Sequence, residues 1–151
     1  MTTIEPMPHA EWTEHALGKL ADAGYRRGGA RTAVVEMLGR QSCAVSARDI
    51  DDALRADGRT IGRASVYRTL ETLADLKLVQ RLDLGGGEKR YEPHGPTGEH
   101  HHHLVCDHCG NVEPFVDSEL ERALEKLAKK STYAVAEHDV VLHGACEDCR
   151  E

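Results

Sequence analysis

IGRASVYRTLETLADLKLVQRLDLGGGEKRYE, the run from Ile61 to Glu92, combines a helix pattern with a hairpin pattern. From Arg63 to Leu76, apolar side chains recur every three or four residues, which predicts an amphipathic helix with an inner face of Val66, Leu70, Leu73 and Ala74. Two short extended runs then lie on either side of a triple glycine, at residues 78–84 and 88–92. They predict a β-hairpin.

Three further helices are expected before this run. The first covers about residues 10–23 and is stopped by Gly24, and the second covers residues 31–39. The third begins after Ser46, and Asp49 stands three residues later, as in a capping box. Helices followed by a hairpin form the winged variant of the helix-turn-helix.

The chain beyond Glu92 predicts a second, smaller module. Proline and glycine are frequent at residues 93–99, which is typical of a linker. The pattern then predicts an extended run at 100–105, a turn at 106–110, a strand at 112–116, a helix at 118–130 with Leu120, Leu124 and Leu127 facing inward, and a strand at 133–142. The expected fold class is α+β, with a winged helix-turn-helix domain at 1–92, a linker at 93–99 and a small α/β domain at 100–151.

Charge is divided unevenly between these modules. The chain of 151 residues has a formal net charge of -7. Residues 1–87 hold 12 basic and 12 acidic residues, whereas residues 88–151 hold 7 basic and 14 acidic residues. The asymmetry indicates modules with different partners, the acidic one suited to cations. No apolar run has bilayer-spanning length and the first residues do not resemble a signal peptide, so we expect a cytoplasmic protein without a membrane partner.

Four of the five cysteines form two Cys-x-x-Cys pairs, Cys106 with Cys109 and Cys146 with Cys149. Two intervening residues let both sulfurs of a pair reach one metal ion, and four thiolates leave no open coordination position. The spacing therefore predicts a structural zinc site rather than two disulfides or idle thiols. Cys43 stands alone, and burial as a small apolar residue is its expected role.

Four consecutive histidines, His100–His103, precede the first cysteine pair. In a strand, neighbouring side chains point to opposite faces, so His101 and His103 would face one way and His100 and His102 the other. The run can therefore serve two metal sites. Glu92 and His94 are candidate partners for one site, and Glu121 and His138 for the other.

Each of these partners also has an ordinary structural explanation. Glu121 is equally well placed to complete a capping box with Ser118. His138 can be a polar strand residue, and His94 can be a linker residue. Spacing alone does not decide between these explanations.

Taken together, these motifs resemble the ferric uptake regulator family from about Gly24 to the end of the chain. The resemblance rests on IGRASVYRTL at residues 61–70, HHHHLVCDHCG at 100–110 and the closing Cys-x-x-Cys. It implies a homodimer, joined through the second domain, whose metal-loaded form binds palindromic operator DNA and represses transcription. It also implies structural zinc on the four paired cysteines.

The resemblance further assigns two exchangeable sites. A regulatory site between the domains would use Glu92, His101 and His103, with His94 as a possible fourth ligand. A second site would use His100, His102, Glu121 and His138. Mixed nitrogen and oxygen ligands are suited to exchangeable binding of Fe²⁺, Zn²⁺ or Mn²⁺.

Departures from the family pattern leave the sensed metal open. Iron-sensing members usually have a histidine where this chain has Ala44, and often a glutamate where it has Pro114. Zinc-sensing members often have an aspartate where this chain has Gln80, and a cysteine where it has His94. Peroxide-sensing members have an aspartate where this chain has Glu92, which argues against that branch.

The helix from Arg63 is the expected DNA reader. Side chains near its N-terminus would reach base edges and phosphates in the major groove, namely Arg63, Ser65, Tyr67 and Arg68. Arg26 and Arg27 match basic residues that family members direct toward the minor groove. The alternatives are core packing for Tyr67 and a solvated surface for the arginines.

The sequence therefore predicts a metal-responsive repressor of metal-uptake genes that is not an enzyme and takes no small organic substrate. Two other classes are weighed against it. A small zinc hydrolase would use the histidine cluster and a general base, but the winged-helix domain would then have no role in the activity. A zinc-ribbon protein-interaction module would show no metal-dependent DNA binding.

Overall fold

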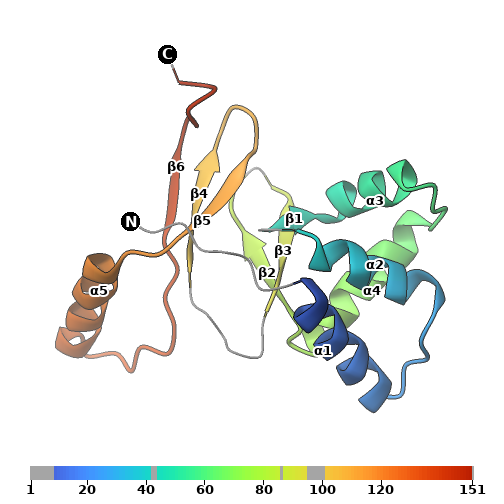
Figure 1. Ribbon diagram of the computed structural model, residues 1–151. Coiled ribbons are helices and arrows are strands. Elements are labelled where there is room, and N and C mark those ends of the chain that lie inside the picture. The colour runs from blue at the N-terminus through green and yellow to red at the C-terminus, as the bar shows by residue number, and fades with distance from the viewer. Residues whose placement is uncertain (1–8, 42–43, 86, 95–100, 151) are drawn as a thin grey trace. The chain divides into compact units, whose positions relative to one another are not determined.

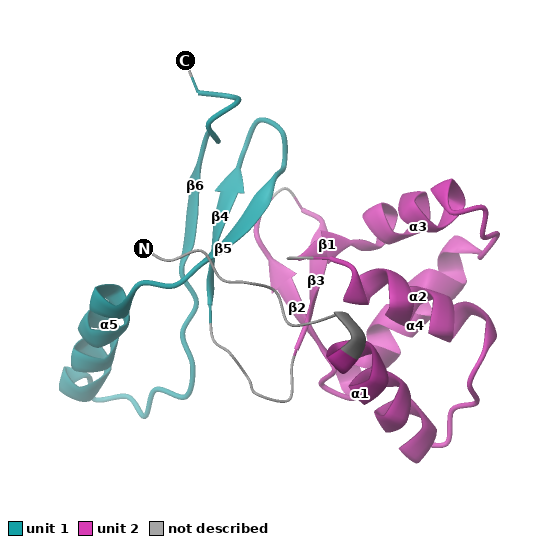
Figure 2. Ribbon diagram, in the orientation of Figure 1, with its two compact units in different colours: residues 1–5, 100–151 teal, residues 6–99 magenta. Residues whose placement is uncertain are grey.

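The computed structural model describes residues 9–41, 44–85, 87–94 and 101–150. They divide into two compact units, called here the N-terminal unit (described residues 9–94) and the C-terminal unit (101–150) (Figure 2). The predicted boundaries at 1–92, 93–99 and 100–151 stay a prediction, because most of the linker lies outside the described residues. Cys43 also lies outside them.

Four helices and a small sheet build the N-terminal unit (Figure 1). The helices are α1 (His9–Asp22), α2 (Gly29–Gly39), α3 (Ala47–Ala56) and α4 (Arg63–Asp75). α1, α2 and α4 lie within two residues of their predicted bounds, and α3 begins directly after Ser46 as predicted. Helical periodicity and the residues that end each helix agree along this half of the chain.

The hairpin consists of β2 (Val79–Asp83) and β3 (Lys89–Pro93), which pair antiparallel with Arg81 opposite Tyr91. A two-residue strand, β1 (Val45–Ser46), pairs with β3 and completes the order β1-β3-β2. It was not predicted, because two residues carry no periodicity. It connects the start of α3 to the hairpin that follows α4.

One apolar core lies among the four helices and the sheet. Its largest fully buried side chains include Trp12, Leu38, Ile50, Leu70 and Tyr91. The indole N–H of Trp12 donates to the carbonyl oxygen of Leu78 at 3.2 Å, so α1 is tied to the start of the hairpin. This packing fixes α4 with Tyr67 exposed on its outer side.

The capping box at α3 is confirmed. The N–H of Asp49 donates to the hydroxyl of Ser46 at 3.1 Å, and the N–H of Ser46 donates to Asp49 Oδ2 at 3.0 Å. The reciprocal bonds satisfy two N–H groups at the point where the chain leaves β1 and enters α3.

The C-terminal unit is a three-stranded sheet with one helix. Its elements are β4 (His102–Cys106), β5 (Val112–Phe115), α5 (Ser118–Lys130) and β6 (Val141–Gly144), and its strand order is β5-β4-β6. β4 pairs antiparallel with β5 and parallel with β6, so both cysteine pairs follow the ends of neighbouring strands. α5 has its predicted bounds, but its N-cap is Asp117.

Two predictions for the C-terminal unit are wrong. The last strand covers only Val141–Gly144 instead of residues 133–142, because β4 begins at His102 and offers no partner to the earlier residues. Leu127 does not face inward: its side chain is 66% exposed, and no residue of α5 is fully buried.

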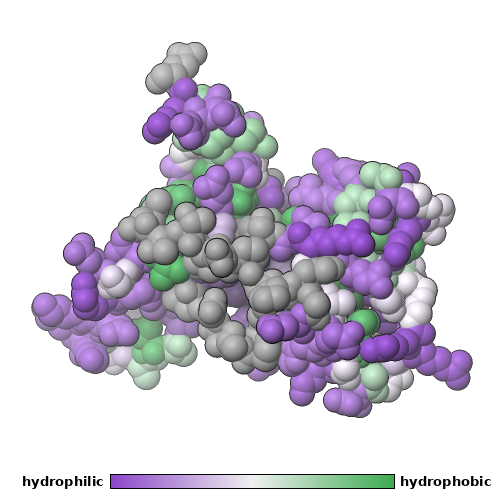
Figure 3. Space-filling model, viewed as in Figure 1, coloured by the Kyte–Doolittle hydropathy of each residue, from purple (hydrophilic) through white to green (hydrophobic). Residues whose placement is uncertain are grey.

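No helix among the described residues is both long and apolar enough to cross a bilayer. Hydrophilic residues cover most of the described surface visible in Figure 3, and apolar residues form only small groups there.

Candidate metal centres and nucleic-acid interface

The four paired cysteines converge at one end of the C-terminal sheet. Their sulfurs all lie within 4.8 Å of one another, and none of the four forms a disulfide. The sulfurs of Cys109 and Cys146 are 3.7 Å apart. Thiolates at about 2.3 Å from a tetrahedral zinc ion are separated by about 3.8 Å. The donor set and its spacing therefore fit a structural zinc ion.

Backbone N–H groups favour ionisation at one of these sulfurs. The N–H of Cys109 donates to the sulfur of Cys106 at 3.5 Å, and that of Cys146 does so at 3.3 Å. These bonds lower the pKa of Cys106 to about 6. The pKa of Cys149 is instead raised to about 12, first by its hydrogen bond with the Cys146 side chain. A second negative charge in this cluster is thus unfavourable without a cation.

A second cluster joins His102 of β4, Glu121 of α5 and His138 of the segment before β6. Nε2 of His102 contacts Glu121 Oε1, and Nε2 of His138 lies 2.9 Å from Glu121 Oε2. His102 is fully buried, and the side chains of Glu121 and His138 are 25% and 30% exposed. Two imidazoles and a carboxylate fit a divalent ion bound by mixed nitrogen and oxygen ligands.

The backbone around this cluster fixes its orientation. The N–H of Val140 donates to His102 Nδ1 at 3.2 Å, so the opposite ring nitrogen points toward α5. Asp117 caps α5 by accepting from the N–H groups of Glu119 and Leu120. The capping alternative for Glu121 is therefore wrong. His100, the fourth expected member, lies outside the described residues.

The regulatory-site candidates are divided between the two units. His101 and His103 approach each other edge to face in the C-terminal unit, with ring centroids 5.0 Å apart, and His103 is buried. Glu92 is buried in β3 of the N-terminal unit. His94 follows β3 with an exposed side chain, and its N–H donates to Leu78.

The candidate DNA residues lie along the first turns of α4 and in the loop before α2. Tyr67 is 46% exposed, so its core-packing alternative is wrong. Arg68 donates to Ser65 Oγ at 3.2 Å. Arg26 and Arg27 are exposed in the loop between α1 and α2.

Sequence reasoning missed the partner of Arg63. Asp51 of α3 is 1% exposed, and its Oδ2 lies 3.4 Å from Nε of Arg63 and 3.3 Å from Nε of Arg55. The carboxylate thus connects α3 to the first residue of α4. The available signal was an aspartate among the apolar positions of a helix face, since the buried residues of α3 are Ala47, Ile50, Asp51 and Leu54.

Comparison with known proteins gives a consistent result. Residues 22–143 match the model of the ferric uptake regulator family. The ferric uptake regulation protein of Legionella pneumophila is 34% identical over 133 residues, which cover 87% of this chain and 96% of the relative. That of Bacillus subtilis is 33% identical over 133 residues, with coverages of 87% and 89%.

Solved structures are similar over most of the chain. The crystal structure of the Vibrio cholerae ferric uptake regulator has a TM-score of 0.77 at 33% identity and covers 85% of this chain and 98% of its own. The Helicobacter pylori regulator has a TM-score of 0.80 at 27% identity, with coverages of 100% and 98%. The family match spans most of the chain, and the chain therefore belongs to the ferric uptake regulator family.

Proposed function

We propose that this protein is a metal-responsive transcriptional repressor that binds palindromic operator DNA as a homodimer and controls metal-uptake genes in the cytoplasm. The observation that carries the proposal is the pair of ligand clusters in the C-terminal unit, together with the exposed polar side chains that α4 presents in the N-terminal unit. Family membership supports a transcription regulator rather than an enzyme.

The cysteine cluster is proposed to hold structural zinc. Cys106, Cys109, Cys146 and Cys149 tie the end of β4 to the segment after β6, and a closed four-thiolate site has no position for a substrate. The Helicobacter pylori relative is described as having three functional metal-binding sites, which supports further sites here.

The second site is proposed to use His102, Glu121 and His138, with His100 as its fourth member. The regulatory site is proposed to use Glu92, His101 and His103, with His94 as its fourth ligand. When bound, Fe²⁺, Zn²⁺ or Mn²⁺ would supply a link between the hairpin and β4, and so favour one arrangement of the two units. Metal affinity and DNA affinity must then be coupled reciprocally.

Operator reading is proposed to use the first turns of α4. Tyr67 is placed to contact a thymine methyl group, and Ser65 and Arg68 to contact the backbone and base edges. Arg63 is held by Asp51, so its side chain would act from a fixed position. Arg26 and Arg27 would reach the adjacent minor groove.

The homodimer is proposed to form through the C-terminal unit. Four large apolar side chains of this unit are exposed in the single chain, namely Leu127, Tyr133, Val135 and Leu142. Exposed apolar surface of this kind marks a protein interface. A second copy is the partner that the family supports.

The rival classes are not favoured. A zinc hydrolase or a zinc-ribbon interaction module would not account for a family match that covers both units.

The direct test is operator binding by the purified protein, titrated separately with Zn²⁺, Fe²⁺ and Mn²⁺ at fixed salt. Stimulation by one metal supports the repressor and identifies the metal. Binding that is indifferent to every metal would overturn metal responsiveness. If a family-type palindrome is not bound, selection from random duplexes decides whether any operator exists.

Replacing both His101 and His103 with alanine tests the regulatory site. The double variant should lose metal-stimulated DNA binding but keep its cysteine-bound zinc and its dimer. His143→Ala is the matched control, because His143 lies in the same sheet but pairs with Asp107 at 3.0 Å. Metal stimulation that survives in the double variant would show that the regulatory site is wrongly assigned.

A further inference from the structure

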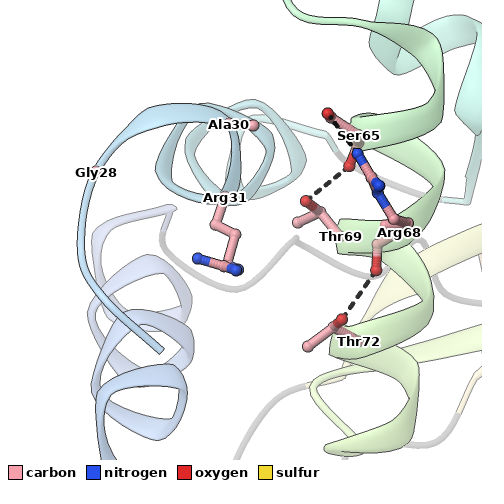
Figure 4. Close-up of a pocket in the computed structure, with 7 residues that line it drawn as sticks. All are labelled: Gly28, Ala30, Arg31, Ser65, Arg68, Thr69 and Thr72. Atoms are coloured by element: carbon pink, nitrogen blue, oxygen red, sulfur yellow. Dashed lines mark hydrogen bonds between the residues drawn. The ribbon is translucent and has the colours of Figure 1, made fainter. Parts of the chain in front are cut away.

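A cavity of about 400 Å³ opens between the first turn of α2 and the side of α4 (Figure 4). Arg31 extends into it from α2, and Ser65, Arg68, Thr69 and Thr72 line it from α4. Two of the lining residues are arginines and none is acidic. The cavity is therefore positively charged.

The arginines of this cavity differ from most others in the N-terminal unit. Arg40, Arg55, Arg59, Arg63 and Arg81 each form an ion pair with a carboxylate. Arg31 and Arg68 form no ion pair within the part of the chain that the structure describes. Glu71, one turn after Arg68, is occupied by Arg81 at 2.6 Å. The charge of the cavity is thus available to an anion.

Local contacts hold Arg31 without neutralising it. The guanidinium carbon of Arg31 lies 4.8 Å from the centroid of the Tyr25 ring, which orients the group by a cation–π contact. A planar guanidinium held in this way is suited to bidentate binding of phosphate oxygens.

The α4 side of the cavity offers one further donor. The hydroxyls of Thr69 and Thr72 donate to carbonyl oxygens of their own helix, at 2.9 Å each, so they are already used. Ser65 Oγ accepts from Arg68, which leaves its hydroxyl hydrogen for a ligand. Donors thus face the cavity from both helices.

We propose that this cavity binds one backbone phosphate of duplex DNA, with Arg31 as its principal ligand and Ser65 and Arg68 beside it. The inference rests on the proposed function and adds Arg31, which the sequence did not single out. A phosphate held here would set the position of α4 along the groove while carrying no sequence information.

The test compares Arg31→Ala with the wild-type protein on the operator and on an unrelated duplex, over a range of salt concentrations. Loss of one charged contact should weaken binding to both duplexes about ten-fold or more. The slope of log affinity against log salt should fall by about 0.9 per contact, or about two for a dimer. Arg31→Lys should restore the slope but only part of the affinity.

Arg40→Ala is the matched control, because Arg40 lies at the opposite end of α2 and is paired with Asp57. Neutral methylphosphonates placed singly along the duplex should identify one phosphate per half-site at which the wild-type protein loses affinity and Arg31→Ala does not. Equal behaviour of Arg31→Ala and Arg40→Ala would overturn the proposal.

Three other outcomes have a defined meaning for the two proposals. If the wild-type protein binds both duplexes equally with any metal, the proposed repressor function is wrong. The salt slopes of wild-type protein and Arg31→Ala still decide whether the cavity binds a DNA phosphate. Saturable binding of inorganic phosphate that is lost in Arg31→Ala, with unchanged DNA salt slopes, would identify a free anion as the ligand and overturn the DNA assignment. A wild-type protein that binds neither duplex, and that also selects no sequence from random duplexes, overturns both proposals.

Discussion

Ser46 stands where β1 ends and α3 begins, and its side chain is almost fully buried. Its hydroxyl accepts from the N–H of Asp49, a helix donor that would otherwise be unsatisfied. We expect Ser46→Ala to lower the free energy of unfolding by about 1 kcal/mol. Urea denaturation followed by the fluorescence of Trp12, which lies in the core of the same unit, measures this difference.

Thr60→Ala is the control for this prediction. Thr60 is exposed and makes no side-chain hydrogen bond among the described residues, so its loss should change stability by less than about 0.5 kcal/mol. If Ser46→Ala proved as stable as Thr60→Ala, the capping box would contribute nothing to the fold.

Glu121 shows where prediction at single residues reaches its limit. Its spacing from Ser118 fitted a capping box, and its spacing from the histidines fitted a metal site. The structure decides between them because α5 is capped by Asp117, one residue earlier, so that the carboxylate faces His102 and His138. Adjacent aspartate and serine are both good caps, and a partner 17 residues away leaves no local signal.

At the scale of elements, periodicity predicted the helices well but not what covers them. α5 has its expected bounds and its leucines recur at helical spacing, yet Leu127 is exposed. An apolar stripe shows that a face is to be buried, not whether the same chain buries it. The strand predicted at 133–142 failed for a related reason, since strands require a neighbour and β4 is too short to provide one.

The exposed face of α5 leads to a prediction about assembly. If a second copy covers Leu127, then Leu127→Asp places a charge in an apolar interface and should shift the protein from dimer to monomer. Sedimentation velocity at micromolar concentration measures this shift. Lys126→Asp is the control, because Lys126 is an exposed neighbour on the same helix and its replacement changes the net charge by even more, about two units against one. A dimer that persists in Leu127→Asp would place the interface elsewhere.

At the scale of the whole molecule, the two units differ in what holds them together. The N-terminal unit buries a large apolar cluster that includes Trp12 and Tyr91. Among the described residues of the C-terminal unit, only Cys106 and Phe115 are both apolar and buried. A unit of this size with so small a core requires another source of stability. The cysteine pairs indicated that source from sequence, because their spacing carries the ligand geometry.

Removal of zinc should therefore unfold one unit and spare the other. A structural zinc ion contributes about 10 kcal/mol or more to folding, which so small a core cannot replace. A strong chelator should release cysteine-bound zinc and lower the helical circular dichroism of the protein by the contribution of α5. The emission maximum of Trp12, the only tryptophan, should not move. Cys149→Ser should show the same loss without chelator, and Cys43→Ser should retain its zinc. A red shift of Trp12 emission in step with zinc release would instead mean that the two units unfold together, and that the N-terminal core depends on the metal.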